Sequence, residues 1–252
     1  MAPVKSFHET PFLSAEWRDL ALLNYEIDPA VLRPLVPAGT ELDAWQGRTF
    51  VSVVGFLFLH MRVRGVPVPF HGCFEEVNLR FYVRRRASEG WRHGVVFVKE
   101  IVPRRAVALA ARLLYGENYA RHPMEHTIER EPAGDARSVS YRWAAQGREN
   151  RLELLADTPA NEMLPGSLEE FLSDVHWGYT ARGGERTFEY RVDHPRWPVR
   201  GAARARLDCD VSALYGRAFQ EPLRAPPASA FLAAGSEVAV SWRATLRNED
   251  HP

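Results

Sequence analysis

Glu75 to Arg86 reads EEVNLRFYVRRR, and this stretch decides the fold. Apolar residues alternate along it with polar ones: Val77, Leu79, Phe81 and Val83 against Asn78, Arg80, Tyr82 and Arg84. A period of two is typical of a β-strand, because successive side chains point to opposite faces. The stretch therefore predicts a strand with one buried and one polar face, and Glu76 belongs to the polar face.

Other strand patterns surround this stretch and fill the second half of the chain. Further strands are predicted at 50–59, 94–102, 137–146, 150–157, 186–194, 203–211 and 237–246. Helices are predicted at 28–36, 104–116 and 167–177, the last opened by a capping box of Ser167 and Glu170. Because strands dominate, we expect a mainly β (α+β) fold, a barrel or sandwich with a few peripheral helices, in one domain over 1–252.

The composition excludes several classes of protein. The 252 residues carry 32 basic and 32 acidic side chains, so no overall field draws the protein to nucleic acid or to a membrane. Cys73 and Cys209 lack metal-ligand spacing, and no apolar run is long enough for a signal peptide or a membrane span. No dinucleotide, P-loop or nucleophile-elbow motif occurs. We therefore expect a cytoplasmic protein without metal or cofactor.

Five stretches resemble the YqjF-like family of conserved proteins of unknown function. They are LLNYEIDPAVLRPLVPAGTELD (Leu22–Asp43), FEEVNLRFYVRR (Phe74–Arg85), KEIVPRRAVALAARLLYGENY (Lys99–Tyr119), SLEEFLSDVHWGYT (Ser167–Thr180) and HPRWPV (His194–Val199). That family in turn resembles acetoacetate decarboxylase, most visibly in the first half of the chain. The resemblance implies a closed β-barrel whose interior holds a small-molecule pocket. It does not establish a reaction, because one fold supports unrelated activities.

Only some of the catalytic and pocket residues of the decarboxylase have an equivalent in this sequence. The decarboxylase has two lysines after a proline, and here the corresponding residues are Arg104 and Arg105. A guanidinium stays protonated and cannot condense with a ketone, so Schiff-base chemistry is not expected at this position. The resemblance also implies that Arg18 and Glu76 are pocket residues and that Ser52 stands where the decarboxylase has a second glutamate.

Two questions about the basic residues stay open at this level. Lys99 is expected to share a strand face with Phe97, so it is either an enclosed amine or an ordinary surface lysine. Arg104 and Arg105 precede a predicted helix, where positive charge is unfavourable. They either bind an anion together with the helix N-terminus or are neutralised by internal ion pairs with glutamates. The candidate partners are Glu75, Glu76 and Glu100.

The sequence thus predicts a barrel that binds a small anionic or oxygenated molecule. If the protein is an enzyme, Glu76 acts as the acid or base in a lyase or isomerase reaction without a Schiff base. The residues expected to contact the ligand are Arg18, Ser52, Asn78, Lys99, Arg104 and Arg105. Tyr115, Asn118 and Tyr119 line the pocket mouth or pack at a helix end. The alternatives are a non-catalytic binding module and a scaffold that forms homo-oligomers.

Overall fold

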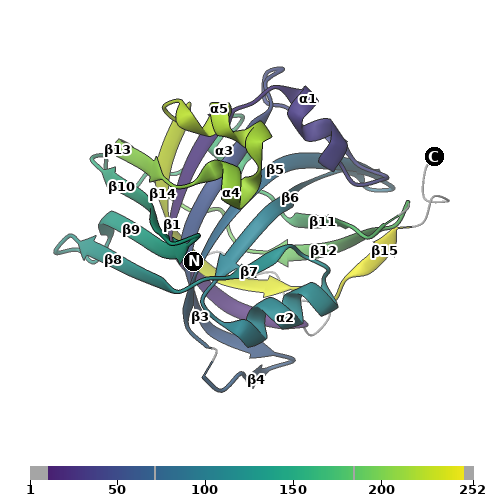
Figure 1. Ribbon diagram of the computed structural model, residues 1–252, viewed down its shortest axis with the longest axis horizontal. Coiled ribbons are helices and arrows are strands. Elements are labelled where there is room, and N and C mark those ends of the chain that lie inside the picture. The colour runs from purple at the N-terminus through teal and green to yellow at the C-terminus, as the bar shows by residue number, and fades with distance from the viewer. Residues whose placement is uncertain (1–10, 71, 184, 247–252) are drawn as a thin grey trace.

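The computed structural model describes residues 11–70, 72–183 and 185–246 and places most of them in strands (Figure 1). The strands are β1 (Leu13–Glu26), β2 (Glu41–Leu42), β3 (Phe50–Val63), β4 (Val66–Pro67), β5 (Phe74–Ala87), β6 (Gly90–Val102), β7 (Tyr119–Arg121), β8 (Met124–Arg130), β9 (Ala136–Ala145), β10 (Arg148–Ala156), β11 (Trp177–Ala181), β12 (Thr187–Asp193), β13 (Val199–Asp208), β14 (Ser229–Val240) and β15 (Ala244–Leu246). The helices are α1 (Pro29–Leu32), α2 (Arg105–Leu114), α3 (Leu168–Ser173), α4 (Val211–Tyr215) and α5 (Gln220–Arg224), with short 3-10 turns η1 (Arg33–Leu35) and η2 (Arg217–Phe219).

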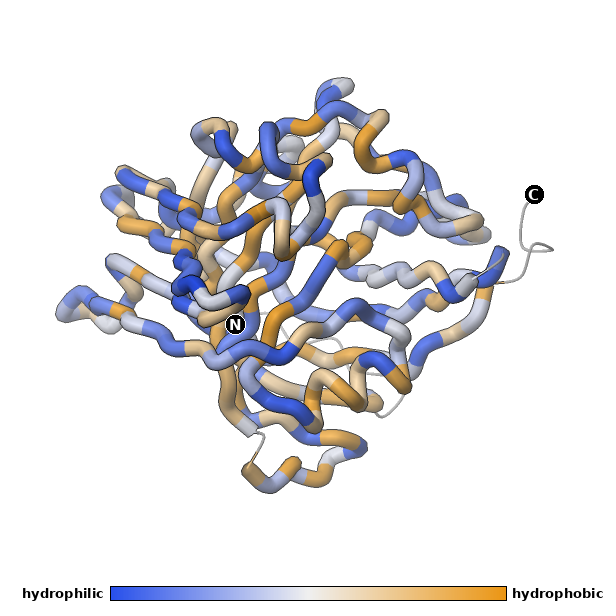
Figure 2. The backbone as a smooth tube through the Cα atoms, viewed as in Figure 1, coloured by the Kyte–Doolittle hydropathy of each residue, from blue (hydrophilic) through white to orange (hydrophobic). Residues whose placement is uncertain are grey.

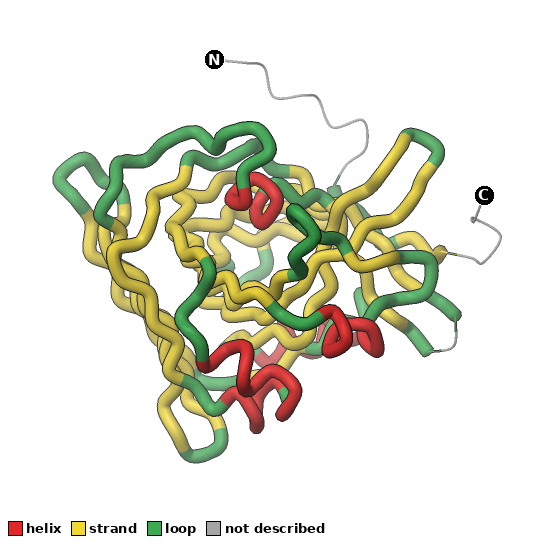
Figure 3. The backbone as a smooth tube through the Cα atoms, turned by 90° about the horizontal axis from the view of Figure 1, so that it is seen from above, coloured by secondary structure: helices red, strands yellow, loops and turns green. Residues whose placement is uncertain are grey.

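Seven strands close into a barrel. Their order is β12-β11-β6-β5-β3-β1-β14, and β12 returns to pair with β14 through Val192↔Val240 and Asp193↔Ala239. Neighbouring strands of this ring are antiparallel except β11 and β6, which run parallel. Seen from above in Figure 3, the strands form a ring. The predicted mainly β fold, a closed barrel with few helices, is confirmed.

A second sheet continues from β14 through β13, β10, β9 and β8 and packs against the outside of the barrel. Val77, Leu79 and Phe81 of β5 point outward and share one apolar core with Tyr141 of β9 and Leu152 of β10. Hydrophobic and hydrophilic residues alternate along the strands in Figure 2. The alternation in residues 75–86 therefore separates this outer core from the barrel interior. The polar face of β5 is buried as well, because it lines that interior.

In Figure 1, α1 and α3 lie in the upper half of the molecule and α2 at the lower end. Helices α4 and α5 contribute Leu214 and Leu223 to the outer core between the barrel and the second sheet. The predicted caps are present: Ala30 N donates to Asp28 at 2.8 Å and Glu170 N donates to Ser167 at 3.2 Å. At α3, the carbonyl oxygen of Leu172 accepts hydrogen bonds from Arg80 and Tyr82 inside the barrel. Over the described residues, none of the helices is both long enough and apolar enough to cross a membrane.

A bulge in β1 ties the barrel to the second sheet. The pairing of β1 with β3 shifts between Arg18 and Ala21, and Asp19 within it has a φ of 55°. Its buried carboxylate accepts two hydrogen bonds from Arg130 of β8, at 3.1 and 2.7 Å. The hydroxyl of Tyr141 on β9 donates to the Asp19 carbonyl oxygen at 2.8 Å. The bulge thus supplies both polar groups that hold the two sheets together at this point.

Replacing Gly235 by alanine is expected to lower the free energy of unfolding by at least about 3 kcal/mol. Gly235 pairs with Arg18 opposite the bulge and has a φ of +79°, and an added Cβ would overlap the carbonyl oxygen of Trp17. Gly65→Ala is the matched control, because Gly65 has the same φ and no described atom within 4 Å of such a Cβ. It should lose only about 1 kcal/mol. Urea denaturation measures both, and equal losses would contradict the close approach at Gly235.

Candidate functional site

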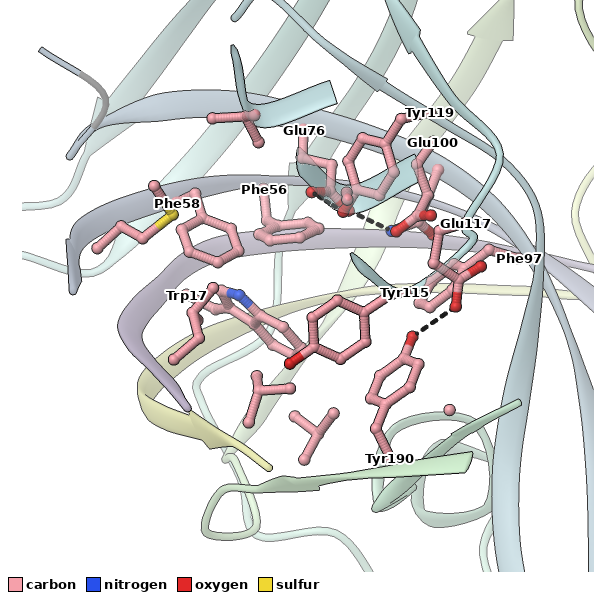
Figure 4. Close-up of a pocket in the computed structure, with 18 of the residues that line it drawn as sticks. Trp17, Phe56, Phe58, Glu76, Phe97, Glu100, Tyr115, Glu117, Tyr119 and Tyr190 are labelled. Atoms are coloured by element: carbon pink, nitrogen blue, oxygen red, sulfur yellow. Dashed lines mark hydrogen bonds between the residues drawn. The ribbon is translucent and has the colours of Figure 1, made fainter. Parts of the chain in front are cut away.

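The barrel encloses a cavity of about 340 Å³ whose wall is largely apolar. Aromatic side chains make up much of that wall, among them Trp17, Phe56, Phe58, Phe74, Phe97, Tyr115 and Trp197. One face of α2 covers part of it through Val107, Ala110, Ala111 and Leu114. The polar side chains that line the cavity include Glu76, Asn78, Arg80, Glu100, Glu117, Tyr119 and Tyr190. Figure 4 shows Glu76, Glu100, Glu117 and Tyr119 close together on one side of the pocket.

Strand alternation and one β-bulge direct Glu76 and Glu100 into the cavity. Glu76 lies on the inward face of β5 with Asn78 and Arg80, as the alternation predicts. On β6 the register shifts, because Leu79 pairs with Lys99 while Arg80 pairs with Phe97. The extra residue, Val98, breaks the alternation. Glu100 therefore points into the cavity as Phe97 does, and it pairs with Asn78 across the strands.

Glu117 and Tyr119 reach the cavity because the chain turns back after α2. The amide of Gly116 donates to the carbonyl oxygen of Ala111 at 3.0 Å, which ends the helix. β7 then runs parallel to β6, with Tyr119 paired to Glu100. Glu117, two residues before Tyr119, enters the same region from the turn. The three glutamates thus come from β5, β6 and the segment between α2 and β7.

Glu76 is 3% exposed and receives two hydrogen bonds. Asn78 Nδ2 donates to Oε1 at 3.1 Å, and the hydroxyl of Tyr119 donates to Oε2 at 3.3 Å. Burial raises the pKa of Glu76 to about 7, while the two hydrogen bonds and Arg80 partly oppose the rise. Glu76 therefore exchanges a proton near neutral pH, which suits a general acid or base.

Glu117 has its own pair of donors. Thr180 and Tyr190 donate to its Oε1 at 2.5 and 2.8 Å. The ring of Tyr190 packs directly against Gly178, where a Cβ would overlap it. Burial raises the pKa of Glu117 to about 7, these two hydrogen bonds lower it, and the charge of Glu76 raises it. A second titratable carboxyl is thus held in the same cavity.

Glu100 differs from the other two because its Oε2 is buried without a hydrogen-bond partner among the described residues. Burial is the main cause that raises its pKa well above the usual range, followed by the charges of Glu117 and Glu76. Of the three carboxyls, Glu100 thus has the protonated form favoured by burial and by both neighbouring charges, and its Oε2 is not engaged by another described residue. A protonated acid beside two carboxyls that titrate near neutrality is an arrangement that can donate and accept protons at one ligand.

Replacing Tyr190 by phenylalanine is expected to raise the pKa of Glu117 by roughly one further unit, because the lost hydrogen bond favours the ionised carboxyl. A carboxyl ¹³C NMR titration measures this. Tyr115→Phe is the matched control, since the Tyr115 hydroxyl lies in the same cavity but donates to the carbonyl oxygen of Ser241. A Glu117 pKa that is unchanged in Tyr190→Phe, or shifted equally by Tyr115→Phe, would contradict this assignment.

Arg80 is the one arginine among the described residues that line the cavity. Its Nη2 donates to the carbonyl oxygen of Leu172 at 2.8 Å, and its Nε has no partner among the described residues. His194 also lines the cavity and stacks on Trp197, with ring centroids 4.2 Å apart. Burial lowers the pKa of His194, so its ring is neutral at pH 7. Arg80 is therefore the arginine that shares the cavity wall with the glutamates, and its charge lowers the pKa of Glu76.

Of the residues predicted as the acid or base or as ligand contacts, the structure places Glu76 and Asn78 in the cavity wall. Tyr115 and Tyr119, candidates for the pocket mouth, also line the cavity. Ser52 is also buried on the inward face of β3, but it does not line the cavity. Its hydroxyl donates to Asn24 Oδ1 at 2.6 Å and lies 2.6 Å from the hydroxyl of Tyr82. Ser52 therefore belongs to a closed polar network inside the barrel.

The expectation that Lys99 shares the face of Phe97 is wrong. The bulge at Val98 turns Lys99 to the outward face, opposite Leu79 of the outer core. Arg18 is likewise outside the cavity, where its Nη2 lies 2.7 Å from Glu16 in an ion pair. It is adjacent to Trp17, which lines the cavity, so alternation along β1 directs Arg18 outward.

Arg104 and Arg105 are exposed at the start of α2 and, contrary to the expectation from the sequence, do not line the cavity. Arg105 lies two residues from Val107, which puts it on the opposite side of the helix. Neither side chain has an ion pair with a described residue, and Glu75 pairs instead with His126 at 2.7 Å. The predicted ion pairs of Arg104 and Arg105 with Glu75, Glu76 or Glu100 are therefore not formed, and anion binding by the arginine pair with the helix N-terminus stays a prediction.

Sequence reasoning missed Glu117 and Tyr190 as site residues and considered Glu100 only as a counter-charge. The KEIVPRRAVALAARLLYGENY stretch contains Glu100, Glu117 and Tyr119, so its resemblance to a family was the available signal. No three histidine, cysteine or acidic side chains among the described residues are grouped to share a metal ion.

Comparison with known proteins gives a family and a fold. The profile of the DUF2071 family, described as an uncharacterized conserved protein, matches residues 14–237. The uncharacterized protein YqjF of Bacillus subtilis (strain 168) is 32% identical over 100 residues, which cover 39% of this chain. The match spans 40% of the length of YqjF.

Solved structures with the same fold are similar over nearly their whole length. The enduracididine biosynthesis enzyme MppR complexed with pyruvate is 13% identical, with a TM-score of 0.68 over 97% of this chain and 94% of that one. The acetoacetate decarboxylase of Legionella pneumophila is 12% identical, with a TM-score of 0.67 over 97% and 92%. An acetoacetate decarboxylase-like enzyme of Sphingomonas wittichii RW1 is 15% identical, with a TM-score of 0.63 over 96% of each chain. At these identities the likeness shows the fold alone.

Proposed function

This chain belongs to the DUF2071 family of uncharacterized conserved proteins, and we propose that it binds a small anionic or oxygenated molecule in its barrel and transfers protons on it. The reaction is of the lyase or isomerase type and proceeds without a Schiff base. One observation carries the proposal: Glu76, Glu100 and Glu117 are buried together in an apolar cavity that is large enough for a small ligand.

The different surroundings of the three carboxyls support a separate role for each. Ionised Glu76 removes a proton from a carbon next to the carbonyl group of the ligand. The electron pair of that C–H bond forms the C=C bond of an enol, and the carbonyl oxygen takes the proton of Glu100. Glu76 then returns its proton, or one that it has exchanged with solvent, to that carbon, while the enol hydroxyl gives its proton back to Glu100. The carbonyl compound is restored, either the original one or its isomer of opposite configuration at that carbon. Charge on Glu117 favours the protonated form of Glu100 that the first step needs.

Two further observations support chemistry without an iminium intermediate. The chain has two lysines, of which Lys5 lies outside the described residues and Lys99 faces away from the cavity. Arg104 and Arg105 follow Pro103, at the positions where the decarboxylase has its two lysines, and a guanidinium cannot form an iminium with a ketone. Among the structural neighbours, MppR is complexed with pyruvate, so this fold accommodates a small carbonyl compound.

Incubation of the protein in D₂O with a panel of ketones and keto acids tests the proposal. We expect catalysed loss of the hydrogen signals next to the carbonyl in ¹H NMR spectra, and no covalent adduct by intact mass spectrometry after borohydride treatment. A borohydride-trapped adduct on Lys99 would overturn the chemistry without a Schiff base. Ligand retention without hydrogen exchange would indicate a non-catalytic binding module instead.

A further inference from the structure

The polar region of the cavity is close to electrically neutral near pH 7. The pKa of about 7 leaves Glu76 and Glu117 each half ionised, so together they carry about one negative charge. Burial and the charges of Glu117 and Glu76 raise the pKa of Glu100 well above the usual range, which favours its uncharged form. The guanidinium of Arg80 balances that single negative charge. An anionic or cationic ligand would therefore leave a net charge in an apolar cavity, which is unfavourable.

The anion partners expected from the sequence are not in this cavity. Arg18 pairs with Glu16 outside it, and Arg104 and Arg105 are exposed. Arg80 already uses Nη2 to bind the carbonyl oxygen of Leu172. A ligand carboxylate would thus meet one partly engaged guanidinium and three glutamates.

Several polar atoms in the cavity wall have no hydrogen-bond partner among the described residues, and they include hydrogen-bond donors as well as one acceptor. Trp17 Nε1 and Arg80 Nε are buried donors without partners among the described residues, and protonated Glu100 has a free Oε2. Asn78 Oδ1 is a buried acceptor without a partner, because the amide group uses Nδ2 to bind Glu76. Since Asn78 and Glu100 are directly paired across β5 and β6, their side chains are neighbours on one face.

We infer that the ligand is an uncharged molecule with an apolar body and a polar end that carries a carbonyl group next to a hydroxyl group, an α-hydroxy ketone or α-hydroxy aldehyde. The carbonyl oxygen accepts from Glu100, and the hydroxyl donates to Asn78 Oδ1. This inference rests on the proposed function only in placing the ligand in the barrel cavity.

The apolar part of the ligand fits the aromatic wall. Trp17 and Phe56 pack with ring centroids 5.3 Å apart, and Phe58 stacks on Phe74 at 4.9 Å. Figure 4 shows Trp17, Phe56 and Phe58 along the same cavity as the glutamates. Such rings offer contact area to a hydrocarbon or aromatic group.

Three probe compounds with the same phenethyl group on a carbonyl carbon test the inference. They are the methyl ketone, the hydroxymethyl ketone and the keto acid, so only the second substituent changes. By isothermal titration calorimetry at pH 7, the hydroxymethyl ketone should bind about five- to tenfold more tightly than the methyl ketone, as one added hydrogen bond implies. The keto acid should bind at least about tenfold more weakly than the methyl ketone, because its charge must be desolvated.

Two variants connect the ranking to the residues. Asn78→Leu should remove the advantage of the hydroxymethyl ketone while the methyl ketone still binds, which also shows that the variant is folded. Glu117→Gln should narrow the gap in affinity between the keto acid and the methyl ketone, because it removes a partly ionised carboxyl from the polar region. An unchanged advantage in Asn78→Leu would overturn the hydroxyl contact, and an unchanged gap in Glu117→Gln would overturn the exclusion of anions by the carboxyls.

The outcomes separate this inference from the proposed function. Tightest binding by the keto acid, equal binding of the two ketones, or no binding of any probe by the folded protein would overturn the inference. The proposed function fails instead if bound ketones show no hydrogen exchange in D₂O. If the three probes bind in the expected order but show no hydrogen exchange, the result supports the ligand class and rejects the proposed proton transfer.

Discussion

Glu76→Gln is expected to slow hydrogen exchange next to the carbonyl of a bound ketone by about a hundredfold to ten-thousandfold, the range that a general base contributes. Glutamine has the size of glutamate and still accepts from Asn78, but it cannot take a proton. Binding of the ketone should change little by comparison. The ratio of exchange rates at saturating ketone, followed by ¹H NMR, is the measurement.

Glu75→Gln is the matched control for this experiment. Glu75 is the preceding residue of β5, points to the other face and pairs with His126 outside the cavity. Its replacement should leave the exchange rate within about twofold of the wild-type rate, because it contacts no cavity residue of the proposed reaction. A similar loss in both variants would mean that β5 has been disturbed. An unaffected rate in Glu76→Gln would remove Glu76 from the mechanism.

Glu117→Gln is expected to increase the free energy of unfolding by about 3 kcal/mol above pH 7. A glutamate in the unfolded chain ionises near its ordinary pKa of 4.5, whereas burial raises the pKa of Glu117 in the folded state to about 7. Ionisation between these values occurs first in the unfolded chain and favours unfolding. The folded wild type therefore loses stability as the pH rises from 4.5 to 7 and then levels off.

Urea denaturation at a series of pH values measures this effect. The Glu117→Gln and wild-type curves should meet near pH 4.5 and separate as the pH rises, because glutamine keeps the oxygen that accepts from Thr180 and Tyr190. Glu75→Gln should show no such gain, since its carboxylate forms an ion pair with His126. Parallel curves for Glu117→Gln and wild type would contradict a raised pKa of Glu117. A stabilised variant would also indicate that the carboxyl cluster is kept at the expense of stability.

Strand periodicity predicted the mainly β fold and one face of the site, whereas the closed barrel was implied by the family resemblance. The alternation in residues 75–86 correctly separates outward Val77 and Leu79 from inward Glu76 and Asn78. The same rule failed on β6, because one additional residue at Val98 reverses the alternation for Lys99 and Glu100. A bulge depends on the register of two strands that are distant in sequence, and nothing in residues 94–102 alone reveals it.

The remaining part of the site depends on tertiary contacts. Tyr190 reaches Glu117 because β12 lies beside β11 in the ring, where Gly178 leaves room for the tyrosine ring. These residues are 73 positions apart, so local pattern cannot connect them. The arginines after Pro103 were placed in the pocket by resemblance to the decarboxylase. In this chain the pocket side of α2 consists of Val107, Ala110, Ala111 and Leu114 instead.

The central claim is that carboxyl groups inside the barrel hold protons at neutral pH. A ¹³C NMR titration of the glutamate carboxyl carbons, with signals assigned from Glu76→Gln, Glu100→Gln and Glu117→Gln, tests it most directly. The account predicts apparent midpoints near 7 for Glu76 and Glu117 and a Glu100 carboxyl that is still protonated at pH 7. Titration of all three carboxyls near 4.5, the value for an ordinary glutamate, would contradict it.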